Sequence, residues 1–389
     1  MANVEILNVD NIEDTNKYTF TLTNVEVCIP NSLRRTILNN IETLVFRGFP
    51  YNSNNINIIS NKTRFNNEYL KHRISCIPIF NNDTSTFGSF KENYKIIINE
   101  ENTTLEKKYV TTEDIKIMNK NTNKEISKED VMKIFPSDNI TGDYILICIL
   151  YPNFNSNEPN EELYLEADFD IGTAEENSCW NVVENCVYEY VRDEEKIEEK
   201  LNSIDDPYEK KNFKILDAQR ICHKNEYKMT VESLGIYNNN QIISMACDYI
   251  KLKLSFILQY FNDSINSEVL TKEQFKSNIT NGTISKEEKE SLYNSYCNIY
   301  KEDNFYIIEL SNDDYTIGKC IEIYLYKLYS NDFSMIAFKK EHPTQSESYI
   351  YIKHKNSKVL YNQICTCLIN TINELLTIFN KIDKTLKSN

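Results

Sequence analysis

The chain has 389 residues, of which 41% are hydrophobic and 26% are charged, so its composition suits a globular protein with two or three hydrophobic cores. Its formal net charge of −15 argues against direct nucleic-acid binding, because neutralising phosphates requires a basic surface. The longest apolar runs, such as residues 145–151, are far shorter than the roughly 18 residues of a membrane span, and residues 1–10 lack the layout of a signal peptide. We therefore expect an intracellular protein, or one carried inside a particle, without a membrane partner.

The eleven cysteines are scattered singly, which is typical of reduced thiols and not of a disulfide framework. The closest pair, Cys365 and Cys367, lies on a predicted helix, where a spacing of two directs the thiols apart. Because the sequence contains no CxxC pair, we expect no metal site and no cofactor.

A strand is predicted at residues 17–25, and Pro30 ends it. Asn31 or Ser32 can then cap an amphipathic helix within NSLRRTILNNIETLVFRGFP, residues 31–50. One helix face carries Leu33, Ile37, Leu38, Ile41, Leu44 and Val45, and the other carries Asn31, Ser32, Arg35, Thr36, Asn39, Asn40 and Glu42. Arg34 falls inside the apolar sector, so its guanidinium either reaches water past a packed stem or meets a partner protein.

A short helix is predicted at residues 66–73, ending before Pro78. At its end, His72 and Cys76 are candidates for a catalytic pair. No Gly-rich turn or oxyanion donor accompanies them, so a packed and solvated helix end is the favoured interpretation.

From residue 81 to about 215, short strands with polar connections predict a separate β-rich module, with strands at 94–98, 145–151 and 163–169. Residues 192–206 are acidic and are expected to form a solvated loop or helix face. Trp180 is expected to anchor a core.

The initial pattern then resumes with a strand at 225–234 and a long helix at 241–261. Residues 263–303 are polar and are predicted to be a linker with a helix at 286–296. After it come a strand at 304–310, a helix capped by Asp313 or Asp314, a strand at 348–353 and a last helix at 357–382. The helix that follows the cap sets Ile317, Cys320, Ile321, Tyr324, Leu325 and Leu328 on one face.

The order strand, helix, strand, long helix therefore occurs twice, which predicts an α+β fold with two similar units in one chain. We expect these units to form a pseudo-two-fold intramolecular dimer, although ordinary core packing would give the same apolar stripes. The first unit comprises residues 1–80 and 216–262 around the 81–215 module, and the second comprises residues 304–389. The expected interface residues are Ile250, Leu254, Ile257, Phe261, Leu368, Ile372, Leu375 and Phe379.

The segment at 31–50, followed by N-x-T and NNEYLKHRISCIPI, resembles the signature of the alpha-like subunits of multisubunit DNA-dependent RNA polymerases. These are the bacterial alpha amino-terminal domain, the archaeal D subunit and the third-largest subunit of eukaryotic RNA polymerase II. The similarity continues through YVTTEDI (109–115), residues 172–190 and MTVESLG (229–235). In the family a His-Ala-x-Trp-like group and a Tyr-Glu-Tyr-like end lie within the 172–190 segment; here Ser178, Cys179 and Trp180 stand at the group, so Trp180 and residues 188–190 agree, but the histidine does not.

The second unit is similar to the smaller alpha-like partner, the archaeal L or eukaryotic eleventh subunit. Its acidic-acidic-aromatic-Thr-Leu-Gly turn corresponds to DDYTIG at 313–318, and its His-Pro to His342 and Pro343. A fused arrangement is similar to what large cytoplasmic DNA viruses of the mimivirus and asfarvirus kinds encode, which implies the virion and the host-cell cytoplasm as locations. The zinc or iron–sulfur cysteines of some family members have no counterpart here.

The resemblance implies a non-catalytic assembly platform on which the two largest polymerase subunits dock, with other small subunits as further partners. It assigns this docking to Arg34 and Arg35, with Asn31 capping the helix and Arg73 nearby. Two alternatives stay open: an acidic interaction scaffold unconnected with transcription, and an enzyme that uses Cys76 and His72.

Overall fold

The computed structural model describes residues 4–12, 16–154, 159–265, 296–356 and 361–388. The chain divides into two compact units. The first comprises residues 1–37, 185–232 and 239–389, and the second comprises residues 38–184 and 233–238. These divisions do not coincide with the expected module boundaries at 81 and 215. Both units mix helices and sheets, in agreement with the predicted α+β class.

The first unit contains a four-stranded sheet in the order β1-β2-β12-β11. Its strands are β1 (Glu5–Ile12), β2 (Lys17–Thr23), β11 (Val183–Arg192) and β12 (Cys222–Ser233). Strand β2 pairs antiparallel with both β1 and β12, and all its residues after Lys17 are buried. Both faces of this central strand are therefore covered.

Helix α1 (Cys28–Asn39) follows β2, and its ends differ from the predicted ones. It begins before Pro30, so neither Asn31 nor Ser32 caps it. Proline is tolerated there because the first-turn N–H groups have no intrahelical acceptor. The helix also ends before Leu44 and Val45, which lie in strand β3 (Thr43–Val45) paired with β10 (Asp170–Gly172). The spacing of Leu44 and Val45 fits a longer helix, but these residues form a strand because they pair with β10.

A second four-stranded sheet of the first unit has the order β13-β14-β16-β15, with every neighbouring pair antiparallel. Its strands are β13 (Cys297–Glu302), β14 (Phe305–Ser311), β15 (Phe333–Lys339) and β16 (Glu347–His354). Strand β13 lies within the predicted linker, which is therefore wrong for those residues, because β13 pairs with β14 and buries Cys297, Ile299 and Tyr300. The helix predicted at 286–296 falls, except for Tyr296, outside the described residues.

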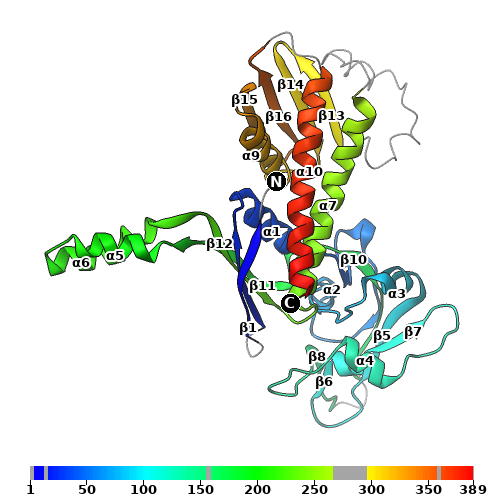
Figure 1. Ribbon diagram of the computed structural model, residues 1–389. Helices are drawn as coiled ribbons and strands as arrows, with labels where there is room; N and C mark the ends of the chain where they lie inside the picture. The colour runs from blue at the N-terminus through cyan, green and yellow to red at the C-terminus, as the bar shows by residue number, and fades with distance from the viewer. Residues whose placement is uncertain (1–3, 13–15, 155–158, 266–295, 357–360, 389) are drawn as a thin grey trace. The chain divides into compact units, whose positions relative to one another are not determined.

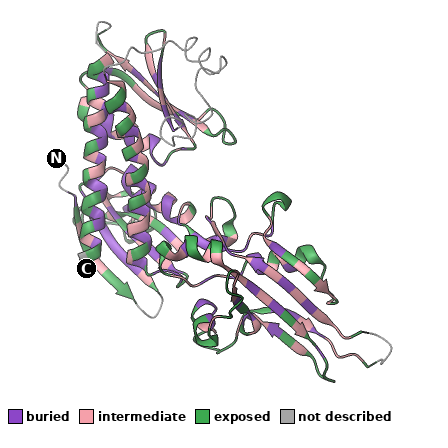
Figure 2. Ribbon diagram, turned by 90° about the vertical axis from the view of Figure 1, so that its right-hand side faces the viewer, coloured by how far each residue is buried: buried purple, intermediate pink, exposed green. Residues whose placement is uncertain are grey.

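Helix α9 (Gly318–Tyr329) connects β14 to β15, and Leu328, predicted to line its apolar face, is exposed. The two long helices are α7 (Asn239–Ser264) and α10 (Tyr361–Ser388). They run side by side in both views and pack on each other (Figure 1, Figure 2). Among the described residues, no helix has the length and apolar character needed to cross a membrane.

Between β11 and β12, the chain forms α5 (Glu194–Asn202) and α6 (Pro207–Ile215), which extend beyond the strand ends (Figure 1). Helix α5 buries Ile197 alone, as expected for a solvated acidic segment. This segment belongs by its contacts to the first unit and not to the second, because it is carried by two strands of the first unit's sheet.

The second unit contains a four-stranded sheet in the order β4-β9-β5-β7 and a two-stranded sheet of β6 and β8. These strands are β4 (Ile56–Asn61), β5 (Tyr94–Glu101), β6 (Lys108–Thr111), β7 (Lys116–Asn119), β8 (Leu146–Leu150) and β9 (Glu162–Asp168). Helices α2 (Asn67–Ser75), α3 (Phe87–Asn93) and α4 (Lys128–Ile134) accompany them. The strands predicted at 94–98, 145–151 and 163–169 are confirmed as β5, β8 and β9.

Candidate subunit interface on helix α1

Helix α1 buries two hydroxyl side chains that were predicted to lie on its polar face, Ser32 and Thr36. Ser32 Oγ donates to Cys28 O at 2.7 Å, lies 2.9 Å from Thr316 O, and contacts Cys320 Sγ at 2.9 Å. A serine hydroxyl in a helix can donate a hydrogen bond to the backbone carbonyl one turn earlier, so it can be buried without losing its hydrogen bond. The prediction that Ser32 and Thr36 lie on a solvated polar face is therefore wrong. The face that carries Ser32 packs against the turn before α9.

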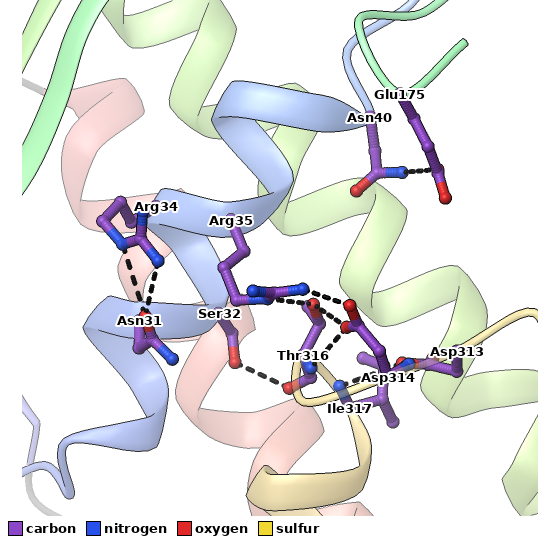
Figure 3. Close-up of polar contacts among 10 residues, drawn as sticks. All are labelled: Asn31, Ser32, Arg34, Arg35, Asn40, Glu175, Asp313, Asp314, Thr316 and Ile317. Atoms are coloured by element: carbon purple, nitrogen blue, oxygen red, sulfur yellow. Dashed lines mark hydrogen bonds and ion pairs between the residues drawn. The ribbon is translucent and has the colours of Figure 1, made fainter. Parts of the chain in front are cut away.

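Arg35 connects α1 to that turn (Figure 3). Its Nε donates to Thr316 Oγ1 at 3.1 Å, and its Nη2 makes an ion pair with the Asp314 carboxylate. Asp314 Oδ1 also accepts from Thr316 N at 3.1 Å and from Thr316 Oγ1 at 3.0 Å. The three side chains form a closed network between the first and second parts of the sequence.

The buried Asp313 holds the same turn from the other side. Its carboxylate accepts hydrogen bonds from the Tyr296 hydroxyl, from Asp314 N at 2.6 Å and from Ile317 N at 3.3 Å. Burial raises the pKa of Asp313, while the Tyr296 hydrogen bond and the charge of Lys253 oppose that rise. Both aspartates bond the turn ahead of α9, and the capping residue itself is Ile317, without a side-chain bond.

Arg34 is half-buried and bonds within its own helix. Its Nε and Nη2 donate to Asn31 Oδ1 at 3.3 and 3.0 Å (Figure 3). Asn31 is therefore an acceptor for Arg34 and not a helix cap. Burial raises the pKa of Cys186 on β11 to about 12, and the charge of Arg34 opposes this rise, so the guanidinium lies near β11. Within the described ranges, Arg34 makes no ion pair.

The eight residues expected at the seam of the long helices are all fully buried. They are Ile250, Leu254, Ile257 and Phe261 on α7 and Leu368, Ile372, Leu375 and Phe379 on α10. Beside them, Lys251 Nζ makes an ion pair with Asp383 at 2.9 Å and with Asp248 at 2.7 Å. Burial acts to raise the pKa of Asp383, but hydrogen bonds from Lys251 and Lys387 outweigh it, and the pKa is lowered.

Arg73 lies in the second unit, whereas Asn31, Arg34 and Arg35 lie together on α1 in the first. Its Nε donates to Ile147 O at 2.9 Å, and its Nη2 donates to Leu146 O. The guanidinium also lies over the rings of Tyr69 and Phe65. Arg73 thus joins α2 to β8.

The candidate catalytic pair lies on the same helix, with Cys76 Sγ 3.9 Å from His72 Nε2. This is the outer limit of a hydrogen bond to sulfur. Cys76 occupies the carboxyl end of α2, where the helix dipole disfavours an anionic nucleophile. The described residues contain no group of three or more His, Cys, Asp or Glu side chains placed to hold a metal ion.

A comparison with known families covers the segment that contains α1. The profile of the RNA polymerase Rpb3/Rpb11 dimerisation domain matches residues 19–254, more than half of the chain. The chain belongs to this family. No curated protein matches it.

Members of the Rpb3/Rpb11 family are non-catalytic polymerase subunits, so the chain is an assembly-type subunit that interacts with other subunits of RNA polymerase. The matched segment begins in β2 and ends in α7. It includes α1 with both arginines and all of the second unit. Residues 304–389, which resemble the smaller alpha-like partner, lie outside the match.

Sequence reasoning missed one polar cluster of this Rpb3/Rpb11 subunit, which surrounds Arg47. Its guanidinium bonds Asp170 at 2.9 Å, Glu176 at 2.6 Å and Ile171 O at 2.9 Å, and lies 4.9 Å from the Trp180 ring centre. The buried Trp180 is a core anchor, as predicted, and its Nε1 donates to Ser75 O at 3.0 Å. Gly172 lies beside this ring, since a Cβ there would be 2.7 Å from it, but no spacing in the sequence connects Gly172 to Arg47.

Proposed function

We propose that the chain is the alpha-like platform of a DNA-directed RNA polymerase, on which the two largest, catalytic subunits dock. The observation that carries this proposal is Arg34, because it sits on a helix within the matched family segment and Asn31 holds its guanidinium in place. No carboxylate of the described residues neutralises it. A fixed guanidinium is well suited to bind a carboxylate or backbone carbonyls of a partner.

The docking residues in this proposal are Asn31, Arg34, Arg35 and Arg73, and their roles differ. Arg34 supplies the contact with a large subunit. Arg35 fixes the helix that presents Arg34, since two of its nitrogens already bond Asp314 and Thr316. Arg73 supplies a separate contact on the second unit. Other small polymerase subunits complete the assembly, and nucleic acid is not bound directly, in keeping with the net charge of −15.

The second part of the proposal is that the chain fuses two dimerisation units into a pseudo-two-fold intramolecular dimer. Helix α1 follows β2 as α9 follows β14, and α7 follows β12 as α10 follows β16. One dimerisation unit contains the β1-β2-β12-β11 sheet with α1 and α7, and the other contains the β13-β14-β16-β15 sheet with α9 and α10. Such a fusion suits a large cytoplasmic DNA virus, with the protein in the virion and in the host-cell cytoplasm.

The test is purification of the tagged chain from its native source, with mass spectrometry of stoichiometric partners and an assay for template-dependent RNA synthesis. We expect both large subunits with the wild-type chain. Arg34→Ala should lower their recovery about tenfold or more, because truncating one side of a buried charged contact costs roughly 2 to 5 kcal/mol.

The matched control is Arg220→Ala, an arginine of the same unit whose side chain is 85% exposed. Normal recovery of the large subunits with an Arg34→Ala, Arg35→Ala double variant would contradict the docking assignment. Recovery of the wild-type chain alone, without polymerase subunits, would instead favour a scaffold unconnected with transcription.

A further inference from the structure

A cavity of about 360 Å³ opens between α2 and β8 in the second unit. Tyr69, His72, Arg73 and Cys76 line it from the side of α2, and residues 145–147 line it from the side of β8. Its volume falls within the range of about 300 to 1,000 Å³ that is usual for ligand pockets. All residues that line the cavity belong to the second unit.

The mouth of the cavity is apolar and exposed. Tyr69 is 45% exposed and Leu146 is 37% exposed, although both are large hydrophobic side chains. Phe65 is also exposed, and its ring centre lies 4.8 Å from that of Tyr69. Clustered exposed aromatic and aliphatic side chains around a concavity are typical of protein-interaction sites.

Arg73 gives the cavity a fixed positive charge. Bonds to the carbonyls of Ile147 and Leu146 and contacts with two aromatic rings hold the guanidinium. An arginine has more N–H donors than these two bonds use, and within the described part of the chain Arg73 makes no ion pair. His72 lines the cavity beside Arg73, and Glu68 is the one acidic residue of α2. A carboxylate is therefore the complementary group.

We propose that this cavity binds an apolar side chain of another polymerase subunit, with a neighbouring Asp or Glu of that subunit meeting Arg73. The inference rests on the proposed function and specifies the chemistry of the partner at one of its docking residues. The exposed apolar surface continues past the cavity over Phe65, which does not line it, so a protein segment buries more of this surface than a free carboxylate-bearing metabolite would. Apolar burial with a fixed arginine beside it is the usual chemistry of an interface hot spot.

The experiment places a photo-crosslinking residue at the cavity mouth of the full chain, as Tyr69→p-benzoylphenylalanine. The tagged chain is purified from its native source with its partners, irradiated, and the crosslinked peptides are sequenced by mass spectrometry. We expect a crosslink to one segment of another polymerase subunit that carries an apolar residue beside an Asp or Glu. A crosslink to nucleic acid, or to a basic segment, would overturn the inference.

Two variants make the result quantitative. Leu146→Glu adds a negative charge at the mouth and should lower the crosslink yield about tenfold or more, as loss of a hot-spot contact does. Leu105→Glu changes a 75% exposed leucine of the same unit that does not line the cavity, and should keep the yield within about twofold.

The outcomes also separate this inference from the proposed function. If the large subunits co-purify but Tyr69→p-benzoylphenylalanine crosslinks to no protein, the inference fails and the platform function stands. If no polymerase subunit co-purifies with the wild-type chain, both fail together.

Discussion

Arg35 is the side chain that joins the helix of the first part of the sequence to the turn of the second, because its two bonds end on Thr316 and Asp314. Nearby, Ser32 and Cys320 make contact across the same junction. Gly318 lies so close to the Phe338 ring that a Cβ would overlap it. The hydroxyl of Ser32 thus permits close packing at the junction, Gly318 permits close packing of α9 on β15, and Arg35 fixes the register of the junction.

Arg35→Ala should lower the free energy of unfolding by about 1 to 3 kcal/mol, since hydrogen bonds to charged groups contribute roughly that much. Arg35→Lys should recover part of the loss, because it keeps the charge but lacks the rigid guanidinium fork whose two nitrogens reach Asp314 and Thr316. Thermal or urea unfolding of the purified chain measures both. Lys133→Ala, which removes an exposed ion pair with Asp130, should leave the free energy of unfolding close to that of the wild type. If Lys133→Ala lowered the free energy of unfolding as much as Arg35→Ala does, the Arg35 network would stabilise the chain no more than an exposed ion pair does.

Some helices and strands could be predicted from the sequence, and others could not. The long helices α7 and α10 and the strands β5, β8 and β9 were predicted from the sequence, because sustained periodicity reports burial directly. The end of α1 was not, since Leu44 and Val45 fit a helical wheel while their pairing with β10 depends on residues more than a hundred positions away. Strand β13 was read as linker, because it is short and partly polar.

The candidate site was predicted to a similar extent. Arg34 and Arg35 and the DDYTIG turn were each recognised as motifs from the sequence. That Arg35 binds Asp314 could not be seen, since the spacing of 279 positions gives no local signal. Arg47 was missed for the same reason, as its partners lie at 170–180.

The pairing of α7 and α10 includes one buried ion pair that makes stability depend on pH. The pKa of Asp383 is lowered in the folded state by Lys251 and Lys387. Its stabilisation is therefore present above the ordinary Asp value of about 4 and is lost as the pH falls through the lower folded value. We expect Asp383→Asn to be less stable than the wild type at pH 7, and the difference to shrink below about pH 4.

Thermal unfolding measured between about pH 3 and pH 7 tests this expectation. Asp217→Asn, at an exposed carboxylate of the same unit, should follow the wild-type profile. A difference between Asp383→Asn and the wild type that stays constant across this range would mean that the Lys251 pair does not stabilise the helix seam.

At the scale of the whole molecule, the two sheets of the first unit are joined by the α7–α10 seam and by the contacts of α1 with the turn before α9. Both sets of contacts link residues before position 265 to residues after position 296. If the chain is a fused dimer, the covalent connection between these parts is not needed for their association. The apolar seam and the Arg35 network alone should hold them.

Co-expression of residues 1–265 and 296–389 as separate chains should therefore yield a one-to-one complex, measured by co-purification and light scattering. Leu368→Asp in the smaller chain should weaken it by more than about a hundredfold, because it places an unpaired carboxylate at a fully buried position of the seam. Asn380→Asp is the matched control, since it also replaces a neutral residue by Asp, at an exposed position of the same helix. Failure of the wild-type halves to associate, with each half folded, would make the seam a feature of one continuous domain and remove the argument for a dimer within the chain.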